Sequence, residues 1–122
     1  MAYRAVRMIA EAAASVPWLV SEGAAEAPDH PLKALLARPN PRQGGAEFME
    51  ALYGHLLLSG NAFVEPVEVG SDLRELHLLR PDRMRVIEGA DGWPSAYEYR
   101  VGGAVRRFSV EAEPGLLHLR LF

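Results

Sequence analysis

Residues 48–64, FMEALYGHLLLSGNAFV, change from a helical to a strand-like pattern of apolar residues within a few positions. One helical face is apolar throughout, at Phe48, Met49, Leu52, Tyr53 and Leu56. This spacing predicts an amphipathic helix with a broad buried stripe. We expect Gly60 to end the helix, because glycine adopts the left-handed conformation without a Cβ clash. A strand is expected from Asn61 onward, so that helix and strand meet at a tight joint.

The N-terminal segment has features of a signal peptide, because Arg4 and Arg7 precede an apolar stretch. Glu11 interrupts that stretch, however. The apolar residues recur at helical spacing, at Val6, Ile9, Ala10 and Ala13. We therefore expect an amphipathic helix over residues 3–15, ended by Pro17, and not a cleaved leader. Since no run reaches the roughly 18 apolar residues that cross a bilayer, we expect a soluble protein made in the cytoplasm, without membrane contacts.

A short helix is predicted between the N-terminal helix and the long one. Pro31 favours the first turn of a helix over residues 31–38, because its missing amide hydrogen costs nothing there. The buried edge of this helix is expected to consist of Leu32, Leu35 and Leu36. The long helix is predicted over residues 45–59, with Glu47 and Glu50 near its positively polarised start. Residues 21–28 are expected to be a flexible connection.

Alternating apolar residues after the long helix predict about six short strands. They fall at residues 62–69, 76–79, 84–88, 96–101, 104–110 and 116–121. Tyr97, Tyr99 and Val101 share one strand face before the Gly102-Gly103 turn, which favours a tight hairpin. Residues 72–75 fit a capped short helix as well as a strand, and we expect a strand. The sequence thus predicts an α+β fold, with N-terminal helices at about residues 3–15, 31–38 and 45–59 and a mostly antiparallel β meander over about residues 61–121.

The composition fits one domain that spans residues 1–122. Of the 122 residues, 49% are hydrophobic, enough for a sizeable core. The formal charge of −3 gives no electrostatic footprint for broad nucleic-acid binding. The absence of cysteine excludes disulfides, thiolate catalysis and zinc–thiolate sites.

Patterns for catalysis and metal binding are missing from the sequence. The histidines are too far apart for a local metal motif: His30, His55, His77 and His118. We expect His55 to be partly buried or at an interface. We expect His118 to make one structural hydrogen bond, on the strand face opposite Leu117 and Leu119. Two carboxylate pairs have structural roles and are no evidence of catalysis. Glu47 and Glu50 suit the start of a helix, and Glu111 and Glu113 suit a solvated turn. We therefore assign no catalytic, cofactor-binding or metal-binding residues, and no cofactor.

Arginine supplies twelve of the thirteen basic residues. Two clusters stand out, Arg80, Arg83 and Arg85, and Arg106 with Arg107. Because Asp82, Glu88 and Glu98 balance this charge, we expect the arginines on solvated strand faces. The alternative is contact with another subunit or with DNA, since guanidinium groups bind carboxylates and phosphates. Of these two, salt bridges between subunits are better supported, and no nucleic-acid-binding residues are assigned.

Two tryptophans and the last strand are further candidates for contacts. Trp18 and Trp93 stand beside prolines, and we expect each to pack a turn onto the core. The alternative is an exposed contact with a neighbouring subunit. The last strand is predicted to lie at a sheet edge and to be prone to association through its apolar residues, Leu116, Leu117, Leu119, Leu121 and Phe122.

Several segments in a fixed order resemble the portal proteins of HK97-type tailed bacteriophages. The long helix ends in Ser59-Gly60-Asn61-Ala62-Phe63, and residues 72–86 read DLRELHLLRPDRMRV. Three other segments fit the same order: residues 9–18 (IAEAAASVPW), 30–41 (HPLKALLARPNP) and 115–120 (GLLHLR). The resemblance covers nearly the whole chain.

This resemblance implies a structural role without catalysis. Such portal subunits form a ring, usually dodecameric, through which DNA enters and leaves the capsid. The implied partners are other portal subunits, the capsid, the terminase and head-tail adaptor proteins, with DNA passing through the ring. The resemblance covers the outer wing region and not the stem, clip or channel helices, so a fragment without specific DNA binding is expected.

The implied location is the host cytoplasm during assembly, then the virion or a gene transfer agent particle. The sequence does not distinguish a prophage from a gene transfer agent. The alternative is a small cytosolic α+β module that binds a peptide or a small ligand.

Overall fold

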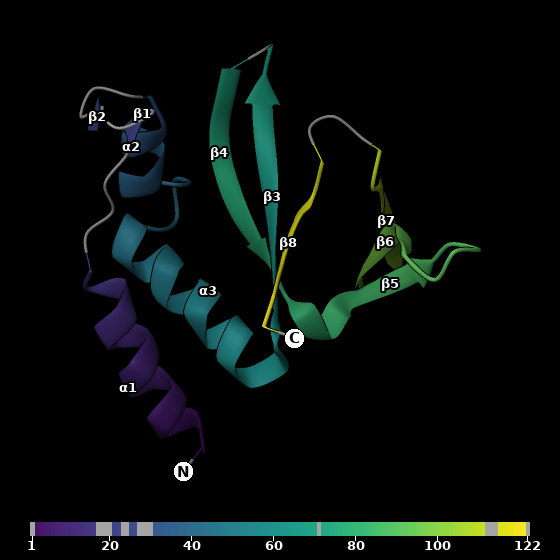
Figure 1. Ribbon diagram of the computed structural model, residues 1–122, viewed down its shortest axis with the longest axis horizontal. Helices are drawn as coiled ribbons and strands as arrows, with labels where there is room; N and C mark the ends of the chain where they lie inside the picture. Colours follow the sequence, from purple (N-terminus) through teal and green to yellow (C-terminus); the bar gives the residue numbers. More distant parts are fainter. Residues whose placement is uncertain are drawn as a thin grey trace.

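The computed structural model describes residues 2–16, 21–22, 25–26, 31–70, 72–111 and 115–121. Within these residues the helices are α1 (Ala2–Ala14), α2 (Pro31–Ala37) and α3 (Gly45–Ser59). The main strands are β3 (Asn61–Val69), β4 (Asp72–Leu79), β5 (Met84–Glu88), β6 (Pro94–Val101), β7 (Ala104–Ser109) and β8 (Leu117–Arg120). A 3-10 helix, η1 (Pro81–Arg83), joins β4 to β5 (Figure 1). The predicted α+β fold is confirmed, with helices first and antiparallel strands after them.

The joint between α3 and β3 has the predicted geometry. Gly60 has a φ of 76°, and its amide donates a hydrogen bond of 2.9 Å to the carbonyl of Leu56. The left-handed conformation stops the helix, and β3 begins at the next residue. Ser59 reinforces the turn, because its hydroxyl accepts a hydrogen bond of 3.1 Å from the amide of Asn61.

The first sheet has the order β4-β3-β8. β3 pairs with β4 as a hairpin, and its first residues also pair with β8, from Asn61 opposite Arg120 to Val64 opposite Leu117. The last strand therefore returns to the first long one instead of extending a meander. Among the described strands β8 lies at a sheet edge, as predicted. Strand structure at residues 72–75 is also confirmed.

The second sheet is a meander of consecutive strands, β5-β6-β7. Its two hairpins are antiparallel, and β6 has Ala96 opposite Ser109 and Val101 opposite Ala104. The tight turn at Gly102-Gly103 is present, with Gly102 at a φ of 59°. Tyr97 and Tyr99 are buried as expected from their shared face, whereas Val101 at the strand end is 48% exposed.

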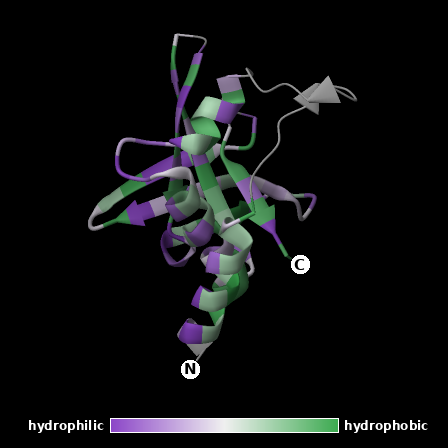
Figure 2. Ribbon diagram, turned by 90° about the vertical axis from the view of Figure 1, so that its left-hand side faces the viewer, coloured by the Kyte–Doolittle hydropathy of each residue, from purple (hydrophilic) through white to green (hydrophobic). Residues whose placement is uncertain are grey.

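Two hydrophobic clusters form the core, one on each side of β3. Phe48, Met49 and Leu52 of α3 pack with Ala62 and Val64 of β3. Phe63 of β3 points into the other cluster, with Leu79, Tyr97 and Tyr99. The layers are thus α1 and α3, then the first sheet, then the second sheet (Figures 1 and 2).

Several predictions about the helices need correction. Ile9 is 56% exposed, because α1 packs on α3 through its small residues and Ala14 contacts the core in its place. On α2, Leu35 is buried but Leu32 is 38% exposed. This short helix buries only a narrow strip of its surface, around Leu35. The connection predicted over residues 21–28 contains a short antiparallel ladder of β1 (Ser21–Glu22) and β2 (Ala25–Glu26). Pro17, Trp18, His30, Glu113 and Phe122 lie outside the described residues.

Substitutions of two glycines in and after α3 are expected to change stability in opposite directions. Gly60→Ala places a Cβ in the left-handed conformation and should lower the free energy of unfolding by about 1–2 kcal/mol. Gly54→Ala lies in the helix interior with no atom within 4 Å of the new Cβ, so the helical propensity of alanine should dominate. This variant should gain about 0.5–1 kcal/mol. Urea unfolding measures both, and a stable Gly60→Ala protein would contradict the assigned helix end.

Candidate functional site

A groove of about 460 Å³ lies between α1 and α3. Its floor is apolar, with Val6 and Ala10 on one side and Ala51 and Gly54 on the other. The charged side chains in its lining are Arg7, Glu47 and Glu50. Since Gly54 has no side chain, the groove is open at that position. Such a lining suits contact with another polypeptide and contains no nucleophile paired with a base.

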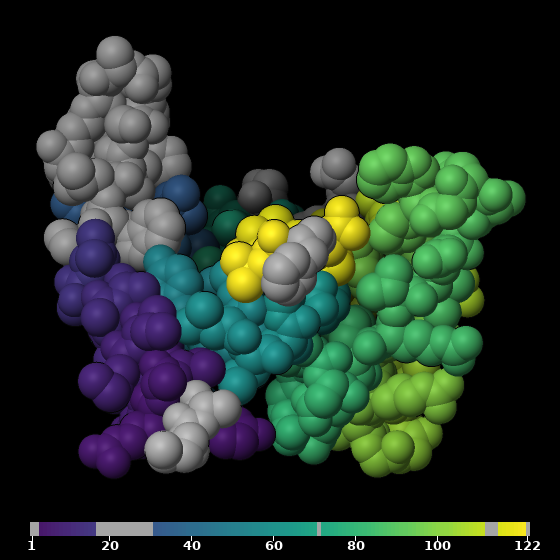
Figure 3. All heavy atoms as spheres, turned by 60° about the horizontal axis from the view of Figure 1, so that its bottom comes forward, coloured from purple at the N-terminus to yellow at the C-terminus, as the bar shows by residue number. Residues whose placement is uncertain are grey.

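A second hollow of about 330 Å³ continues the groove past the end of α3. Tyr3 and Leu58 line both, and His55, Arg80 and Asp82 line only the second. Figure 3 shows the surface hollowed here, between α1 in purple and the segment around η1 in green. Burial lowers the pKa of His55, while Asp82 raises it and Arg80 lowers it by smaller amounts. His55 is half-buried, as predicted, and is neutral at physiological pH.

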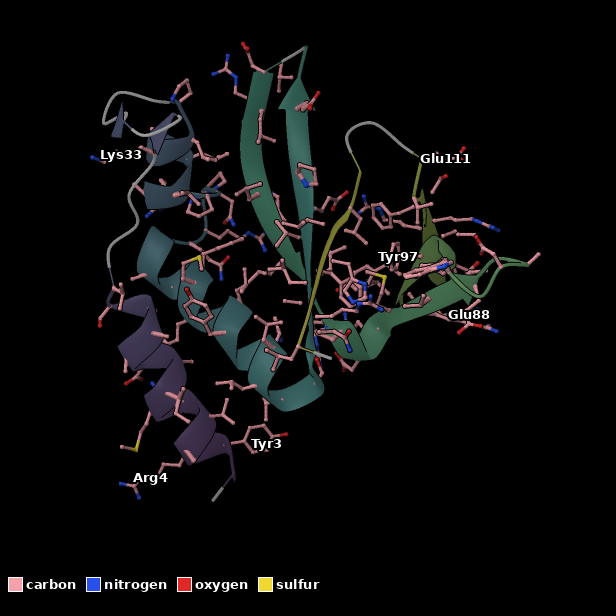
Figure 4. The ribbon with its side chains drawn as sticks, in the orientation of Figure 1. Tyr3, Arg4, Lys33, Glu88, Tyr97 and Glu111 are labelled. Carbon is pink, nitrogen blue, oxygen red and sulfur yellow. The ribbon has the colours of Figure 1, made fainter. Side chains whose placement is uncertain are left out.

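The two sheets are joined by a cluster of rings around His118 of β8. The imidazole stacks on Phe63 with ring centroids 4.4 Å apart. Tyr97 of the second sheet meets the same imidazole edge-on, and its hydroxyl lies 3.2 Å from Nδ1 (Figure 4). On the other side Nε2 lies 2.8 Å from Oδ1 of Asn61. His118 therefore makes two hydrogen bonds, one more than predicted.

The hydrogen-bond network defines the tautomer of His118. The side-chain amide nitrogen of Asn61 donates to the carbonyl of Ser59 over 3.1 Å, so its oxygen faces the imidazole. Nε2–H must then donate to that oxygen, and Nδ1 accepts from the Tyr97 hydroxyl. Burial lowers the pKa of His118, and the charge of Arg120 lowers it further. Burial likewise raises the pKa of Tyr97, so its hydroxyl keeps its proton. The neutral pair is the stable form of this junction.

An ion pair also links the sheets. Arg106 of β7 donates two hydrogen bonds to the carboxylate of Glu65 of β3, one of them 3.1 Å long. The Glu65 carboxylate raises the pKa of Arg106. The phenol of Tyr99 adds a third link, because it accepts a hydrogen bond of 3.1 Å from the amide of Arg80. One residue of each arginine cluster thus serves the fold itself.

Arg85 and Arg107 lie on a solvated strand surface, as predicted, whereas Arg80 and Arg83 lie in the turn between the sheets. Arg85 and Arg107 are both opposite Glu98 in the second sheet, so one acidic residue stands between two basic ones. Arg80 pairs with Asp82 over 2.7 Å within the turn. Arg83 is exposed beside it. The prediction that Trp93 packs on the core is wrong, because its side chain is 67% exposed at the end of the β5–β6 hairpin.

Two asparagines matter to the structure and were not singled out by sequence. Asn40 is buried between α2 and α3, and its side-chain amide donates to the carbonyl of Leu76 over 2.9 Å. It thereby ties the loop before α3 to β4. Asn61 orients His118 as described. Neither forms part of a periodic pattern, and only the position of Asn40 between two prolines marks it as a special turn.

The remaining candidate residues do not converge on one site. His77 of β4 pairs with Glu75 two residues away, over 2.7 Å, and His55 and His118 lie on different elements. Across the described ranges, no three groups of the metal-ligating types come together. No helix in the same ranges is both long and apolar enough to cross a bilayer. The arrangement supports binding of another macromolecule through its grooves and exposed aromatic residues.

Comparison with known proteins gives a consistent result. Residues 1–122 match the family described as phage portal protein. Two uncharacterized proteins of Rickettsia are similar, one from R. bellii with 42% identity over 81 residues and one from R. felis with 30% identity over 111 residues. These matches cover 63% and 89% of this chain but only 20% and 28% of the two relatives.

Solved structures of gene transfer agent (GTA) particles contain similar chains. A chain in the neck of an empty GTA particle, computed with C6 symmetry, is 47% identical with a TM-score of 0.91. Chains in a native GTA virion and in a native GTA neck computed with C12 symmetry are 46% and 47% identical, each with a TM-score of 0.80. All three matches cover 98% of this chain. The chain spans 31–33% of the length of those chains.

The lowered pKa of His118 makes stability depend on pH. The unfolded chain takes up a proton near the ordinary pKa of 6.5, and the folded protein takes it up only at lower pH. Between these two values the unfolded state binds more protons, so the free energy of unfolding falls as the pH falls. The stabilisation is complete above about 6.5 and is lost below it. The pKa of His55 is also lowered, so this residue too makes the free energy of unfolding fall as the pH falls.

Urea unfolding between pH 7.5 and 5 measures this dependence. His118→Gln keeps an amide able to bond Asn61 but cannot titrate, so its pH slope below 6.5 should be shallower than that of the native protein. The matched variant His55→Gln should remove a separate part of the pH dependence, and the double variant should remove the contributions of both histidines. An unchanged slope in His118→Gln would contradict the lowered pKa of the half-buried imidazole.

Proposed function

The chain belongs to the phage portal protein family, and from this premise we propose that it is a structural part of a portal ring in a gene transfer agent particle. The observation that carries the proposal is the similarity to a chain in a GTA particle neck, with 47% identity and a TM-score of 0.91 over 98% of this chain. Identity at this level extends across both sheets and all three described helices, not merely one motif.

Residues 1–122 act in this proposal as one domain of the wing type. Support comes from the shared strand β3, which contributes to both hydrophobic clusters and so joins the helices to the second sheet. Cooperative burial on both faces of one strand favours folding as a unit. The domain would provide outer surface and rigid spacing within the ring.

The partners follow from the same assignment. The primary partner is a second copy of the same protein, since one similar neck structure was computed with C12 symmetry. Capsid, terminase and head-tail adaptor proteins are the other partners that the family implies. Assembly would take place in the cytoplasm and leave the protein in the finished particle.

A non-catalytic role is part of the proposal. The groove between α1 and α3 has carboxylates on one helix only. His77 pairs with Glu75, and His118 bonds to Asn61 and Tyr97, whereas His55 lines the second hollow. A nucleophile is usually activated by an adjacent base, and the linings of the two hollows offer no such pair. We therefore assign the exposed surfaces to assembly.

Electron microscopy tests the ring. The product of the complete reading frame that contains these residues, purified and concentrated, is expected to form ring-shaped particles of uniform diameter. Analytical ultracentrifugation of the same sample should show one assembled species whose mass is a fixed multiple of the subunit. Single subunits at every concentration tested would contradict the proposal and would favour a small binding module.

DNA binding tests whether the arginines serve another purpose. We expect weak binding of a fluorescent duplex, with a small salt slope between about 50 and 200 mM, because a steep slope requires several phosphate contacts. The physical reason is that Glu98 lies between Arg85 and Arg107 and the chain has a formal charge of −3. A steep slope that Arg85→Ala reduces, while the matched Arg42→Ala does not, would make this sheet a nucleic-acid surface.

A further inference from the structure

α1 has an apolar face that nothing in the described structure covers. The residues of this face, here called the outer face of α1, follow helical spacing: Ala5, Met8, Ile9 and Ala12. All are exposed, including Met8 at 65% and Ile9 at 56%. The side that packs on α3 is a different one, which includes the buried Ala10. α1 faces the viewer in Figure 2 and presents hydrophobic as well as hydrophilic residues.

The tip of the β5–β6 hairpin, residues 88–93, has a second unusual surface. Trp93 is exposed there, although tryptophan is the residue most enriched among interface hot spots. Its backbone is held in place: the amide donates to Oδ1 of Asp91 over 3.0 Å, and its carbonyl accepts from Gly89 over 2.7 Å. A backbone that is already fixed loses little conformational freedom on binding.

The two surfaces lie on opposite sides of the molecule. Figure 1 places α1 at one end of the longest axis and the β5–β6 hairpin at the other. A ring of identical subunits uses a heterologous interface, in which each subunit presents two different surfaces that meet those of its neighbours. An exposed apolar helix face and an exposed tryptophan on opposite flanks satisfy this requirement.

We infer that the hairpin tip of one copy docks on the outer face of α1 of the next copy, with Trp93 against Met8 and Ile9. This inference rests on the proposed function and names the contact between neighbouring subunits. The thioether of Met8 suits such a contact, because sulfur packs favourably against aromatic rings and the side chain adapts its shape.

The charges on the two surfaces are complementary. The hairpin tip has Glu88 and Asp91 and no basic residue. Beside the outer face of α1 stands Arg4, which makes no ion pair with the described residues. Arg7 lies on the groove side of the helix and pairs with Glu11 over 3.0 Å. Arg4 and Glu88 point away from the molecule on opposite flanks in Figure 4. Docking would bring an acidic tip to the basic start of the helix, which favours this orientation over its reverse.

Site-specific cross-linking tests the contact, because the chain has no cysteine of its own. Ala5→Cys and Ala90→Cys each add one exposed thiol at the edge of the contact and keep Trp93, Met8 and Ile9. Under mild oxidation a mixture of the two variants should give a disulfide-linked dimer, whereas each variant alone should not. The matched control Val69→Cys, on the exposed end of β3, should link to neither. Circular dichroism confirms that each variant is folded.

Two further substitutions test the chemistry of the contact. Trp93→Ala in the Ala90→Cys chain should reduce the linking rate about tenfold or more, as the loss of a hot-spot tryptophan does. Glu88→Arg in the same chain should also slow linking, and Arg4→Glu in the partner should restore it. Restoration is not expected if the substitutions merely disturb the fold.

Other results would overturn the inference. Self-linking of either single variant would indicate a symmetric contact, and equal linking of Val69→Cys would indicate random collision. Absence of any link also contradicts it. If the complete product forms rings in the microscope but the selective link is absent, the contact is wrong and the proposed function stands. If the link forms selectively but no rings appear, the contact stands and the portal assignment falls.

Discussion

Residues 62–64 of strand β3 are buried on both faces of the strand, and the rest of the structure depends on this constraint. Ala62 and Val64 face α3, while Phe63 between them faces the second sheet. A slip of one residue in the register of this strand would exchange the two sets of side chains and disrupt both clusters at once. The left-handed Gly60 prevents such a slip, because it fixes where the helix ends and therefore which residue of β3 comes first.

Local sequence patterns were sufficient to predict the helices and strands but not to predict which strands pair. The 3.6-residue period of α3, the glycine after it and the alternation in β5 and β6 identify each element by residues close together in the sequence. The return of β8 to β3 depends instead on contacts between residues more than fifty positions apart, such as Asn61 with His118. No turn motif in the sequence predicts that β8 pairs with β3. The exposure of Ile9 and Trp93 was missed for a related reason, since residue type alone does not show whether another element covers a side chain.

The burial of the candidate residues was partly predictable, and their geometry was not. Scattered histidines and balanced arginines led us to predict a chain whose surfaces bind rather than react, and this stays a prediction. The half-buried state of His55 followed from its place on the helix. The two hydrogen bonds of His118 could not be predicted from the sequence, because Tyr97 reaches it from the other sheet. Similarly, the sequence separates Glu65 and Arg106 by 41 positions, and only the packing of the two sheets turns two surface charges into one link.

The contacts that link the two sheets affect how α1 and the β5–β6 hairpin are oriented relative to each other, and this matters for the proposed assembly. In a closed ring the angle between the two interaction surfaces of a subunit determines how many subunits complete the circle. Here α1 packs against α3 on one side of β3, whereas the β5–β6 hairpin belongs to the sheet on the other side. Their relative orientation therefore depends on the Phe63–His118–Tyr97 cluster and the Glu65–Arg106 pair. In the ring that we propose, the imidazole bonded to Tyr97 and Asn61 at this junction would help to fix that angle, so the contacts that join the two sheets would also affect the geometry with which copies meet.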